Sequence, residues 1–475
     1  MGIGTNIGRM STTSRGGLAV AVLVAATAGV GLAQENPRAF ARAVLDELIG
    51  INTTDSSGDN TAAAQAVARR LRAAGFPAED VEVVVPAPAK GNLVARLRGA
   101  GHGRPVLFLA HLDVVEARRE DWTRDPFRLQ EQDGYLYGRG TQDIKGEAAL
   151  LVANFVRLRQ EGFRPERDLI LALTADEEGG RGPNGVRFLL DRRRPLLDAE
   201  FCVNTDGGGG QSVSGRPILY SVQAAEKGYL TFTLRARRPG GHSSQPVPEN
   251  AIYDLAAALL KVRDLQFPVR LNDITRRYFE GTARLKQGQE AADRLAVAKG
   301  GPEAEAAAAR LSRLPYENAL LRTTCVATLL AGGHAENALP QSAEASVNCR
   351  VLPGEAQSEV EARLRAAVGS GVLLEATSPL RENPVSLPPP ALLAQIESVV
   401  HAATPLLPVV LTMETGGTDG KSLRAAGIPT YGLAEMFYDL DDVRAHGQDE
   451  RIRVSDFEQG LDFGYRLARE LARSR

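Results

Sequence analysis

Three stretches of the sequence decide the fold: VLFLAHLD at residues 106–113, LILALTADEE at residues 169–178 and FCVNTD at residues 201–206. Each begins as an apolar run of strand length and ends in histidine or acidic residues. Continuous apolar runs of this length are typical of parallel strands buried on both faces. The carboxyl ends of strands are where ligands gather in open α/β sheets. These stretches therefore predict a largely parallel sheet with a polar site at the strand ends.

Strand and helix patterns on either side of these stretches divide the chain. Residues 34–222 and 383–475 alternate short apolar strands with amphipathic helices, which indicates one α/β domain in two segments. Between them, residues 223–382 follow the order β-α-β-β-α-β of a ferredoxin-like fold. Residues 271–317, rich in Ala, Arg and Glu, predict a helical insertion whose charges form a solvated face. The predicted fold is α/β, with a mostly parallel sheet covered by helices on both faces and split by an inserted ferredoxin-like α+β domain.

The N-terminal segment differs from the rest of the chain. Residues 1–33 contain Arg9 and Arg15, no acidic residue, and the apolar run GGLAVAVLVAATAGVGLA. Together these features predict a signal peptide that is cleaved after Ala33. The protein is then secreted or periplasmic, and its mature form has no membrane partner. The alternative is an uncleaved membrane anchor, although the run is short for a span of about 20 residues.

Composition excludes several classes of partner. The 475 residues include 56 Lys and Arg against 58 Asp and Glu, which gives a net charge of −2. This balance gives no electrostatic reason to expect a nucleic acid or an anionic membrane as a partner. Hydrophobic residues make up 43% of the chain, which is close to the globular norm and sufficient for a large core.

Cysteine contributes little to the predicted architecture. The chain has three, Cys202, Cys325 and Cys349, which are too few for a disulfide framework. Cys325 and Cys349 fall on the two strands of one predicted hairpin, nearly opposite each other, and alternate with apolar residues. Because disulfide geometry is narrow and cysteine is commonly buried as a thiol, we expect both to be free. An oxidised pair is the alternative.

Acidic and imidazole side chains mark the predicted site. Six of them follow the apolar strands: His111, Asp113, Asp176, Glu177, Glu178 and Asp206. Asp143 begins the helix after the segment GRGTQ. Buried carboxylates without partners are costly, and several that converge repel one another unless cations hold them. The pattern therefore favours a metal site.

A series of motifs in this order resembles the di-zinc exopeptidase and aminoacylase family. The motifs are HLD, GRGTQDIKG, ADEEGG, NTDGG, GGHSSQP, NALPQSAEASVNCRVLPG, TGGTDG and RAHGQDERI. The family includes glutamate carboxypeptidase, carboxypeptidase S, acetylornithine deacetylase and succinyl-diaminopimelate desuccinylase. The resemblance covers nearly all of the mature chain. The long insertion and its RRYFE segment are most similar to the carboxypeptidase S-like branch.

The resemblance implies two zinc ions, with Co²⁺ or Mn²⁺ as possible substitutes. His111, Asp143 and Asp206 would bind one ion. Asp143, Glu178 and His446 would bind the other, so that Asp143 bridges the pair. Imidazole and carboxylate ligands suit zinc. The resemblance also implies a cis peptide bond after Asp143.

Other residues take implied roles in catalysis. Glu177 would be the general base that activates a metal-bridging hydroxide and then protonates the leaving amine. Asp113 would orient the imidazole of His111. His242 would stabilise the oxyanion, in some family members from a partner subunit, which leaves open a homodimer through the inserted domain. Five positions match those that bind substrate: Asn337, Arg350, Gly416, Gly417 and Thr418.

The sequence therefore predicts a metallohydrolase that cleaves a peptide or amide bond next to a free carboxylate, as a carboxypeptidase-type exopeptidase does. Its substrate is then a small peptide. The alternative is an N-acyl-amino-acid amidohydrolase, in which the same chemistry acts on an N-acyl amino acid. A third interpretation is a binding protein on a peptidase scaffold, which would be expected to have lost ligands or Glu177. The sequence departs from the common family pattern at Ile144, at Glu147 and at residues 447–450.

Overall fold

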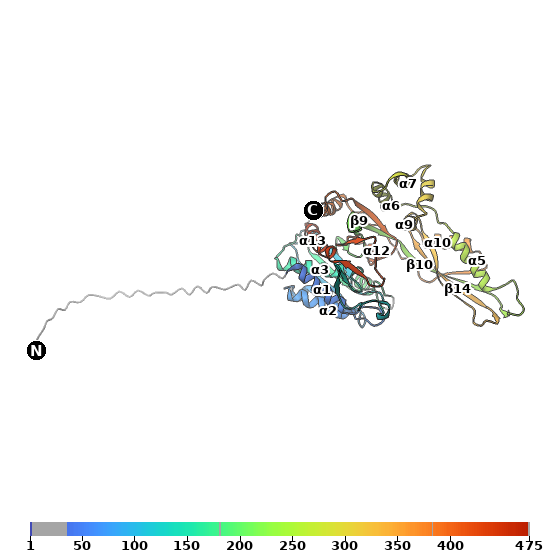
Figure 1. The fold of residues 1–475 in the computed structure, drawn as a ribbon, viewed down its shortest axis with the longest axis horizontal. Coiled ribbons are helices and arrows are strands. Elements are labelled where there is room, and N and C mark those ends of the chain that lie inside the picture. The colour runs from blue at the N-terminus through green and yellow to red at the C-terminus, as the bar shows by residue number, and fades with distance from the viewer. Residues whose placement is uncertain (2–35, 180–181, 382, 474–475) are drawn as a thin grey trace. The chain divides into compact units, whose positions relative to one another are not determined.

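A computed structural model describes Met1 and residues 36–179, 182–381 and 383–473 of the chain (Figure 1). The predicted signal peptide lies outside these described residues, apart from Met1. Among the described residues, the helices are all too short or too polar to cross a membrane.

A large ten-stranded sheet forms the centre of the fold. In spatial order its strands are β1 (Val81–Val84), β2 (Asn92–Leu97), β6 (Leu169–Thr174), β3 (Val106–His111), β7 (Phe201–Asn204), β17 (Thr430–Gly432), β9 (Arg216–Glu226), β8 (Gly209–Val213) and β18 (Phe437–Asp439), with β16 (Val409–Glu414) also paired to β9. The central strands β6, β3, β7 and β17 are parallel neighbours. Antiparallel pairs join β1 to β2, β2 to β6 and β8 to β9. The predicted mostly parallel α/β sheet is thus confirmed.

Helices cover both faces of this sheet because its central strands are apolar on both sides. All six residues of β3 are buried. Phe108 and Ala110 join one core, while Leu107 and Leu109 join another. The first core contains residues of α1 (Pro37–Gly50), α2 (Asn60–Ala73), α3 (Lys145–Gln160), α11 (Pro390–Ala403) and α13 (Val454–Leu471). The second contains residues of α4 (Gly185–Arg192) and α12 (Gly420–Ala425).

A second, four-stranded sheet is antiparallel and has its own core. Along the chain its elements are β10 (Gly228–Arg237), α5 (Ala251–Asp264), β12 (Thr324–Gly332), β14 (Ser342–Val351), α10 (Gln357–Val368) and β15 (Leu373–Ala376). The strands lie in the order β12-β14-β10-β15. Residues of α5 and α10 pack with alternate residues of the strands. Because β9 stays in the large sheet as far as Glu226, the expected domain boundary at residue 222 falls inside this strand.

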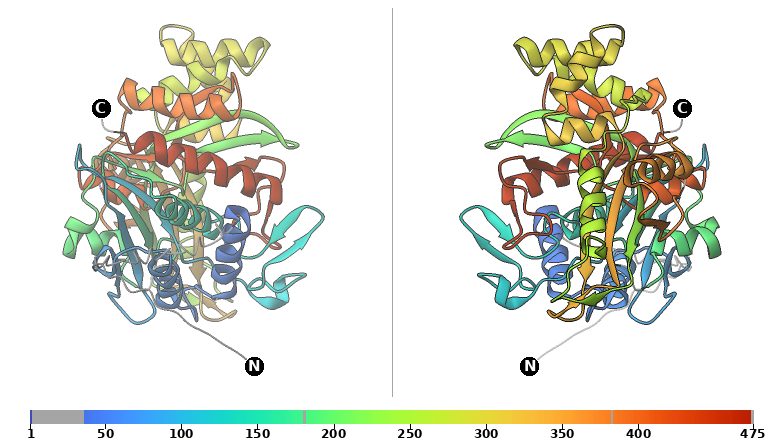
Figure 2. Two further views of the ribbon diagram at one scale, coloured as in Figure 1. Left: turned by 90° about the vertical axis from the view of Figure 1, so that its left-hand side faces the viewer. Right: turned by 90° about the vertical axis from the view of Figure 1, so that its right-hand side faces the viewer.

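Four helices lie between α5 and β12: α6 (Asp273–Ala283), α7 (Gly288–Lys299), α8 (Ala304–Leu311) and α9 (Pro315–Leu321). They are drawn in yellow in Figure 2, and α6 packs against β16 of the large sheet. The expectation that their charges form a solvated face is wrong for several residues. Arg294 and Glu317 form an ion pair in which both side chains are buried, and Asp293 is buried beside Arg310. These helices pack on one another, so charges on the inner faces are buried with partners.

Cys325 and Cys349 form a disulfide. The expectation of two free thiols is therefore wrong. The physical reason is the register of β12 and β14, which places Cys325 directly opposite Cys349 in the antiparallel pair. Cys202 is a free, buried cysteine on β7.

This pairing predicts the thiol count of the protein. After unfolding without a reductant, we expect a thiol reagent to modify one cysteine, Cys202. After reduction it should modify all three, because the Cys325–Cys349 bond is then broken. Peptide mapping identifies the modified sites. Three reactive thiols before reduction would contradict the disulfide.

Candidate functional site

The candidate site lies where three neighbouring parallel strands end. His111 is the last residue of β3, Glu177 and Glu178 follow the end of β6, and Asp206 follows the end of β7. Since β3 pairs in parallel with both β6 and β7, these segments leave the sheet at the same edge. The structure thus brings together side chains that are up to 95 residues apart in the chain.

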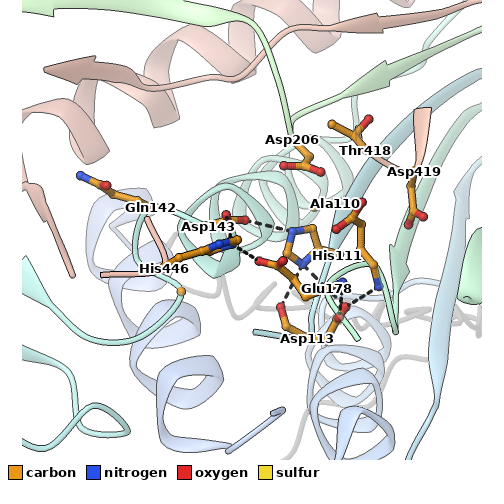
Figure 3. A network of polar contacts seen from close by, with 12 residues as sticks. Ala110, His111, Asp113, Gln142, Asp143, Glu178, Asp206, Thr418, Asp419 and His446 are labelled. Atoms are coloured by element: carbon orange, nitrogen blue, oxygen red, sulfur yellow. Dashed lines mark hydrogen bonds and ion pairs between the residues drawn. The ribbon is translucent and has the colours of Figure 1, made fainter. Parts of the chain in front are cut away.

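Asp143 lies between two imidazoles at this edge, just before α3 begins (Figure 3). One carboxylate oxygen, Oδ1, is 3.1 Å from Nε2 of His111. The other, Oδ2, is 3.0 Å from Nε2 of His446, which is also 2.6 Å from Oε1 of Glu178. The peptide bond from Asp143 to Ile144 is cis, as the resemblance implied. Each oxygen of Asp143 therefore faces a different histidine.

Two groups of these residues could hold a metal ion. The ligand atoms of His111, Asp143 and Glu178 lie within 4.8 Å of one another, and so do those of His111, Glu177 and Asp206. Imidazole nitrogen and carboxylate oxygen are ligands that zinc and neighbouring divalent metals accept. The second group contains Glu177, to which the resemblance gives a proton-transfer role instead. The grouping by distance thus differs from the implied ligand sets, because it places Asp206 with Glu177 instead of Asp143 and includes His446 in neither group.

The electrostatics of the site favour a bound cation. Burial raises the pKa of Asp206 well above its usual value, and the nearby Glu177, Asp143 and Glu178 raise it further. Burial also raises the pKa of Glu177 to about 8. Hydrogen bonds to Asp143 and Glu178 raise the pKa of His446 to about 10. The crowded carboxylates therefore draw positive charge to themselves, and a divalent ion would relieve their repulsion.

Asp113 supports the site in a way that sequence reasoning did not anticipate. Its main-chain carbonyl lies 2.9 Å from Nδ1 of His111 and accepts the ring proton, while its carboxylate oxygen Oδ1 lies 3.7 Å from the same nitrogen. Its carboxylate accepts the backbone N–H groups of Glu177, at 3.2 Å, and Glu178, at 2.8 Å. Asp113 thus ties the end of β3 to the turn after β6. With Nδ1 engaged, Nε2 of His111 is directed toward Asp143.

Glu450 is a second supporting residue, and it was not selected from the sequence. Its fully buried carboxylate accepts the backbone N–H groups of Gln142, at 2.7 Å, and Asp143, at 3.0 Å. It also pairs with the buried guanidinium of Arg139 at 2.6 Å. These bonds fix the loop that carries Asp143 against the loop that carries His446. The only signal in the sequence was an acidic residue four positions after His446, within a segment that departs from the family pattern.

A buried ion pair positions the loop that contains Thr418. Both oxygens of Glu226 bind this residue, through its backbone N–H and its hydroxyl, and the Glu226 carboxylate also pairs with Arg424. The Thr418 hydroxyl accepts a hydrogen bond from Asn204 at 2.9 Å. Asn204 in turn accepts the backbone N–H of Asp206 at 3.2 Å. The loop and the end of β7 are therefore held in one hydrogen-bonded chain.

Glu147 explains one departure from the family pattern. It lies in the first turn of α3 and is fully buried. Its carboxylate accepts the backbone N–H groups of Glu435 and Met436, at 2.9 and 3.0 Å, and the hydroxyl of Tyr438 at 3.0 Å. Glu147 thereby holds the segment before β18 at the side of the site.

A cavity of about 320 Å³, the catalytic cavity below, opens beside these residues. Asp143, Asp206, Gly416, Gly417 and Thr418 line it, together with other residues. The Gly416–Gly417–Thr418 loop that the resemblance assigned to substrate binding is therefore next to the acidic cluster.

The other two predicted substrate-binding residues, Asn337 and Arg350, and the predicted oxyanion-stabilising His242 lie on the elements of the second sheet or beside them and do not line the catalytic cavity. His242 lies on the exposed two-residue strand β11 (Gly241–His242), which pairs with β13 (Ala338–Leu339). The backbone N–H of Ser243 donates to the carbonyl of Asn337 at 3.0 Å, so His242 and Asn337 are neighbours. Arg350 is on β14, and the Cζ atom of its guanidinium lies 4.8 Å from the centre of the Tyr229 ring.

Curated relatives share most of the chain's length. A probable carboxypeptidase S-like 2 of Dictyostelium discoideum is 28% identical over 401 residues, which are 80% of this chain and 74% of the relative. The human N-fatty-acyl-amino acid synthase/hydrolase PM20D1 is 29% identical over 381 residues, which are 77% of this chain and 73% of the relative.

The fold also resembles solved structures. An M20 family metallo-carboxypeptidase, Sso-CP2 from Sulfolobus solfataricus, superposes with a TM-score of 0.70 over 91% of this chain and 99% of that one. The two sequences are 16% identical, so this likeness concerns the fold alone. The sequence model of peptidase family M20/M25/M40 matches residues 107–470, and this range includes every predicted site residue. The chain therefore belongs to peptidase family M20/M25/M40 and is a metal-dependent hydrolase of the peptidase and amidohydrolase type.

Proposed function

We propose that this protein hydrolyses a peptide or amide bond next to a free carboxylate, as a carboxypeptidase-type exopeptidase. The observation that carries the proposal is the arrangement of Asp143 between His111 and His446, with Glu177 at the same sheet edge. A cluster of this kind holds divalent cations and a proton-transfer group together, which is what amide hydrolysis without a serine or cysteine nucleophile requires.

We propose two zinc ions as the cofactors. One would be held by His111, Asp143 and Asp206, and the other by Asp143, Glu178 and His446. The donor set supports this assignment, and so does the electrostatic demand for positive charge at the site. When bound, two divalent ions polarise the scissile carbonyl and lower the pKa of the attacking water.

The residues of the chain would divide the remaining work. Glu177 takes a proton from the attacking water and delivers it to the leaving nitrogen. Asp113 holds the backbone of Glu177 and Glu178 and orients His111. Arg350 and Asn337 bind the substrate carboxylate, since a guanidinium matches a carboxylate with two hydrogen bonds. His242 stabilises the negative charge that develops on the carbonyl oxygen.

A second candidate function is the hydrolysis of N-acyl amino acids. The same residues would perform it, because the scissile bond is again an amide next to a free carboxylate. The human relative is named for N-fatty-acyl amino acids. A second cavity, which shares Glu414 with the catalytic cavity and is lined in part by apolar and aromatic side chains, favours this candidate.

A substrate panel separates the two candidates. The protein, reconstituted with zinc, would be incubated with dipeptides, tripeptides and N-acyl amino acids that release the same C-terminal amino acid. The released amino acid is then quantified. Faster release from peptides supports the exopeptidase, and faster release from N-acyl amino acids supports the amidohydrolase. Release from neither class would contradict the proposed function.

Glu177→Gln should retain both metal ions yet lose turnover by about 10²–10⁴-fold, because an amide cannot take up the proton. Metal content and kcat are the measurements. The matched control is Glu305→Gln, at an exposed position of α8 that does not line the catalytic cavity, and it should behave as the wild type. Near-normal turnover of Glu177→Gln would exclude this residue as the general base.

Asp143→Ala should lose more metal than Asp206→Ala. Only Asp143 is assigned to both ions, so its removal affects both sites at once. Elemental analysis after dialysis against metal-free buffer gives the number of ions per chain. Two ions still bound to Asp143→Ala would refute the bridging role.

We also propose a homodimer formed through the second sheet. Its edge strand β12 leaves Val326, Leu329 and Leu330 with 61%, 69% and 71% of their surface exposed. A long apolar edge strand is a template for pairing with another chain. Such a dimer would allow His242 to act at the partner's site.

Leu330→Arg should convert the dimer into a monomer, because it places a charge on the apolar edge. Light scattering after size-exclusion chromatography measures the mass. The control Leu406→Arg changes a residue with 92% of its surface exposed, outside the second sheet, and should leave the mass unchanged. A wild-type protein that is already monomeric would reject the proposal.

A further inference from the structure

A second cavity of about 640 Å³ lies between the large sheet and the helices α6, α7 and α9. Figure 1 shows these helices near β9. Apolar or aromatic side chains supply much of its wall: Ile218, Leu219, Tyr278, Leu285, Tyr316 and Leu440. Ligand pockets of this size and composition are typical of sites for small molecules. We call this the insertion cavity.

Four charged residues line the insertion cavity: Arg294 and Glu317 pair with each other, Lys286 pairs with Glu290 outside the wall, and Glu414 lies where this cavity meets the catalytic cavity. The guanidinium of Arg294 donates to the carboxylate of Glu317 at 2.5 Å and to the hydroxyl of Thr282 at 2.8 Å. Both charged side chains of this pair are buried. The pair therefore contributes little net charge, and an apolar ligand has apolar side chains to contact.

Several apolar lining residues remain uncovered. Leu285, Tyr316 and Leu440 leave 37%, 42% and 48% of their surface exposed. Solvent-exposed apolar side chains that cluster around a cavity mark a binding site more often than isolated exposed apolar side chains do. A ligand with an apolar body would remove that surface from water.

The insertion cavity adjoins the catalytic cavity. Glu414, the last residue of β16, lines both. Thr412, earlier on β16, also lines the insertion cavity. Gly416, two residues after the end of β16, lines the catalytic cavity. On the other side, Tyr438 lines the catalytic cavity and Leu440 lines the insertion cavity. A chain-like substrate could therefore extend from one cavity into the other past Glu414.

We propose that the insertion cavity binds the apolar acyl chain of an N-acyl amino acid whose amide bond lies in the catalytic cavity. This inference rests on the proposed amidohydrolase function. The carboxylate end of such a substrate is assigned to residues on the second sheet and beside it, so the acyl end is the part left to face the insertion cavity. The preferred substrates are then amides of medium or long fatty acids.

Chain-length dependence is the first test. The zinc-loaded protein would hydrolyse N-acetyl-, N-hexanoyl- and N-decanoylglycine, with glycine release as the readout. Each CH₂ group that enters the cavity should raise kcat/KM by about two- to fourfold until the cavity is filled. A flat or falling series would overturn the proposal, while release of glycine from any of these substrates would still support the amidohydrolase.

Filling the cavity is the second test. Leu285→Trp and Ile218→Trp should lower kcat/KM for N-decanoylglycine about tenfold or more, mainly through KM, and should change kcat/KM for N-acetylglycine less than twofold. The control is Leu295→Trp, because Leu295 lies on the same insertion with 39% of its surface exposed but does not line the cavity. Equal losses for both substrates would overturn the proposal.

Binding without turnover separates this proposal from the proposed function. Calorimetry with Glu177→Gln should detect N-decanoylglycine, and adding Leu285→Trp should weaken its binding about tenfold. If the wild type hydrolyses no N-acyl amino acid but this binding pattern is found, the catalytic proposal fails and the chain site stands. If N-decanoylglycine binds no more tightly than N-acetylglycine, the chain site is rejected.

Discussion

The repulsion among partly buried carboxylates at one edge of the large sheet is the constraint on which the rest of the site depends. Asp143, Glu177, Glu178 and Asp206 converge there, and the pKa of Asp206 rises well above its usual value because the group is buried among like charges. Such a cluster is tolerable only with a compensating positive charge. A bound metal ion would supply that charge, and it would also serve the hydrolytic chemistry of this metal-dependent family.

Other buried acids hold this cluster in place by a different kind of compensation. The Glu450 carboxylate accepts three backbone N–H groups and pairs with the guanidinium of Arg139, and the Glu226 carboxylate binds Thr418 and Arg424. Each buried carboxylate has donors within hydrogen-bond distance, so neither needs a metal. The fold thus separates acids that position loops from acids that remain available at the site. Removing one partner of either pair would leave an uncompensated buried charge.

The two adjoining cavities give the substrate site two distinct ends. The acidic residues Asp143 and Asp206 line the catalytic cavity, whereas apolar and aromatic side chains line the insertion cavity beyond Glu414 together with polar ones. The helices α6, α7 and α9 supply one side of that apolar space, and β8, β9 and β16 supply another. The helical insertion α6–α9 is therefore a candidate determinant of which substrates the protein accepts.

The sequence by itself determined the parallel sheet and the acidic and imidazole residues at its strand ends, because apolar strands such as residues 106–110 and the polar residues after them are local patterns. It also placed the helices of the insertion. The place of His446 in the ligand set came only from the resemblance to the family. Tertiary structure alone decided the Cys325–Cys349 bond, the anchoring role of Glu450 and the burial of Arg294 with Glu317. These depend on strand register and on contacts between segments up to 311 residues apart, as for Arg139 and Glu450. Composition and periodicity report which face of an element is apolar, but not which distant side chain meets it, because that pairing is fixed only when the elements pack.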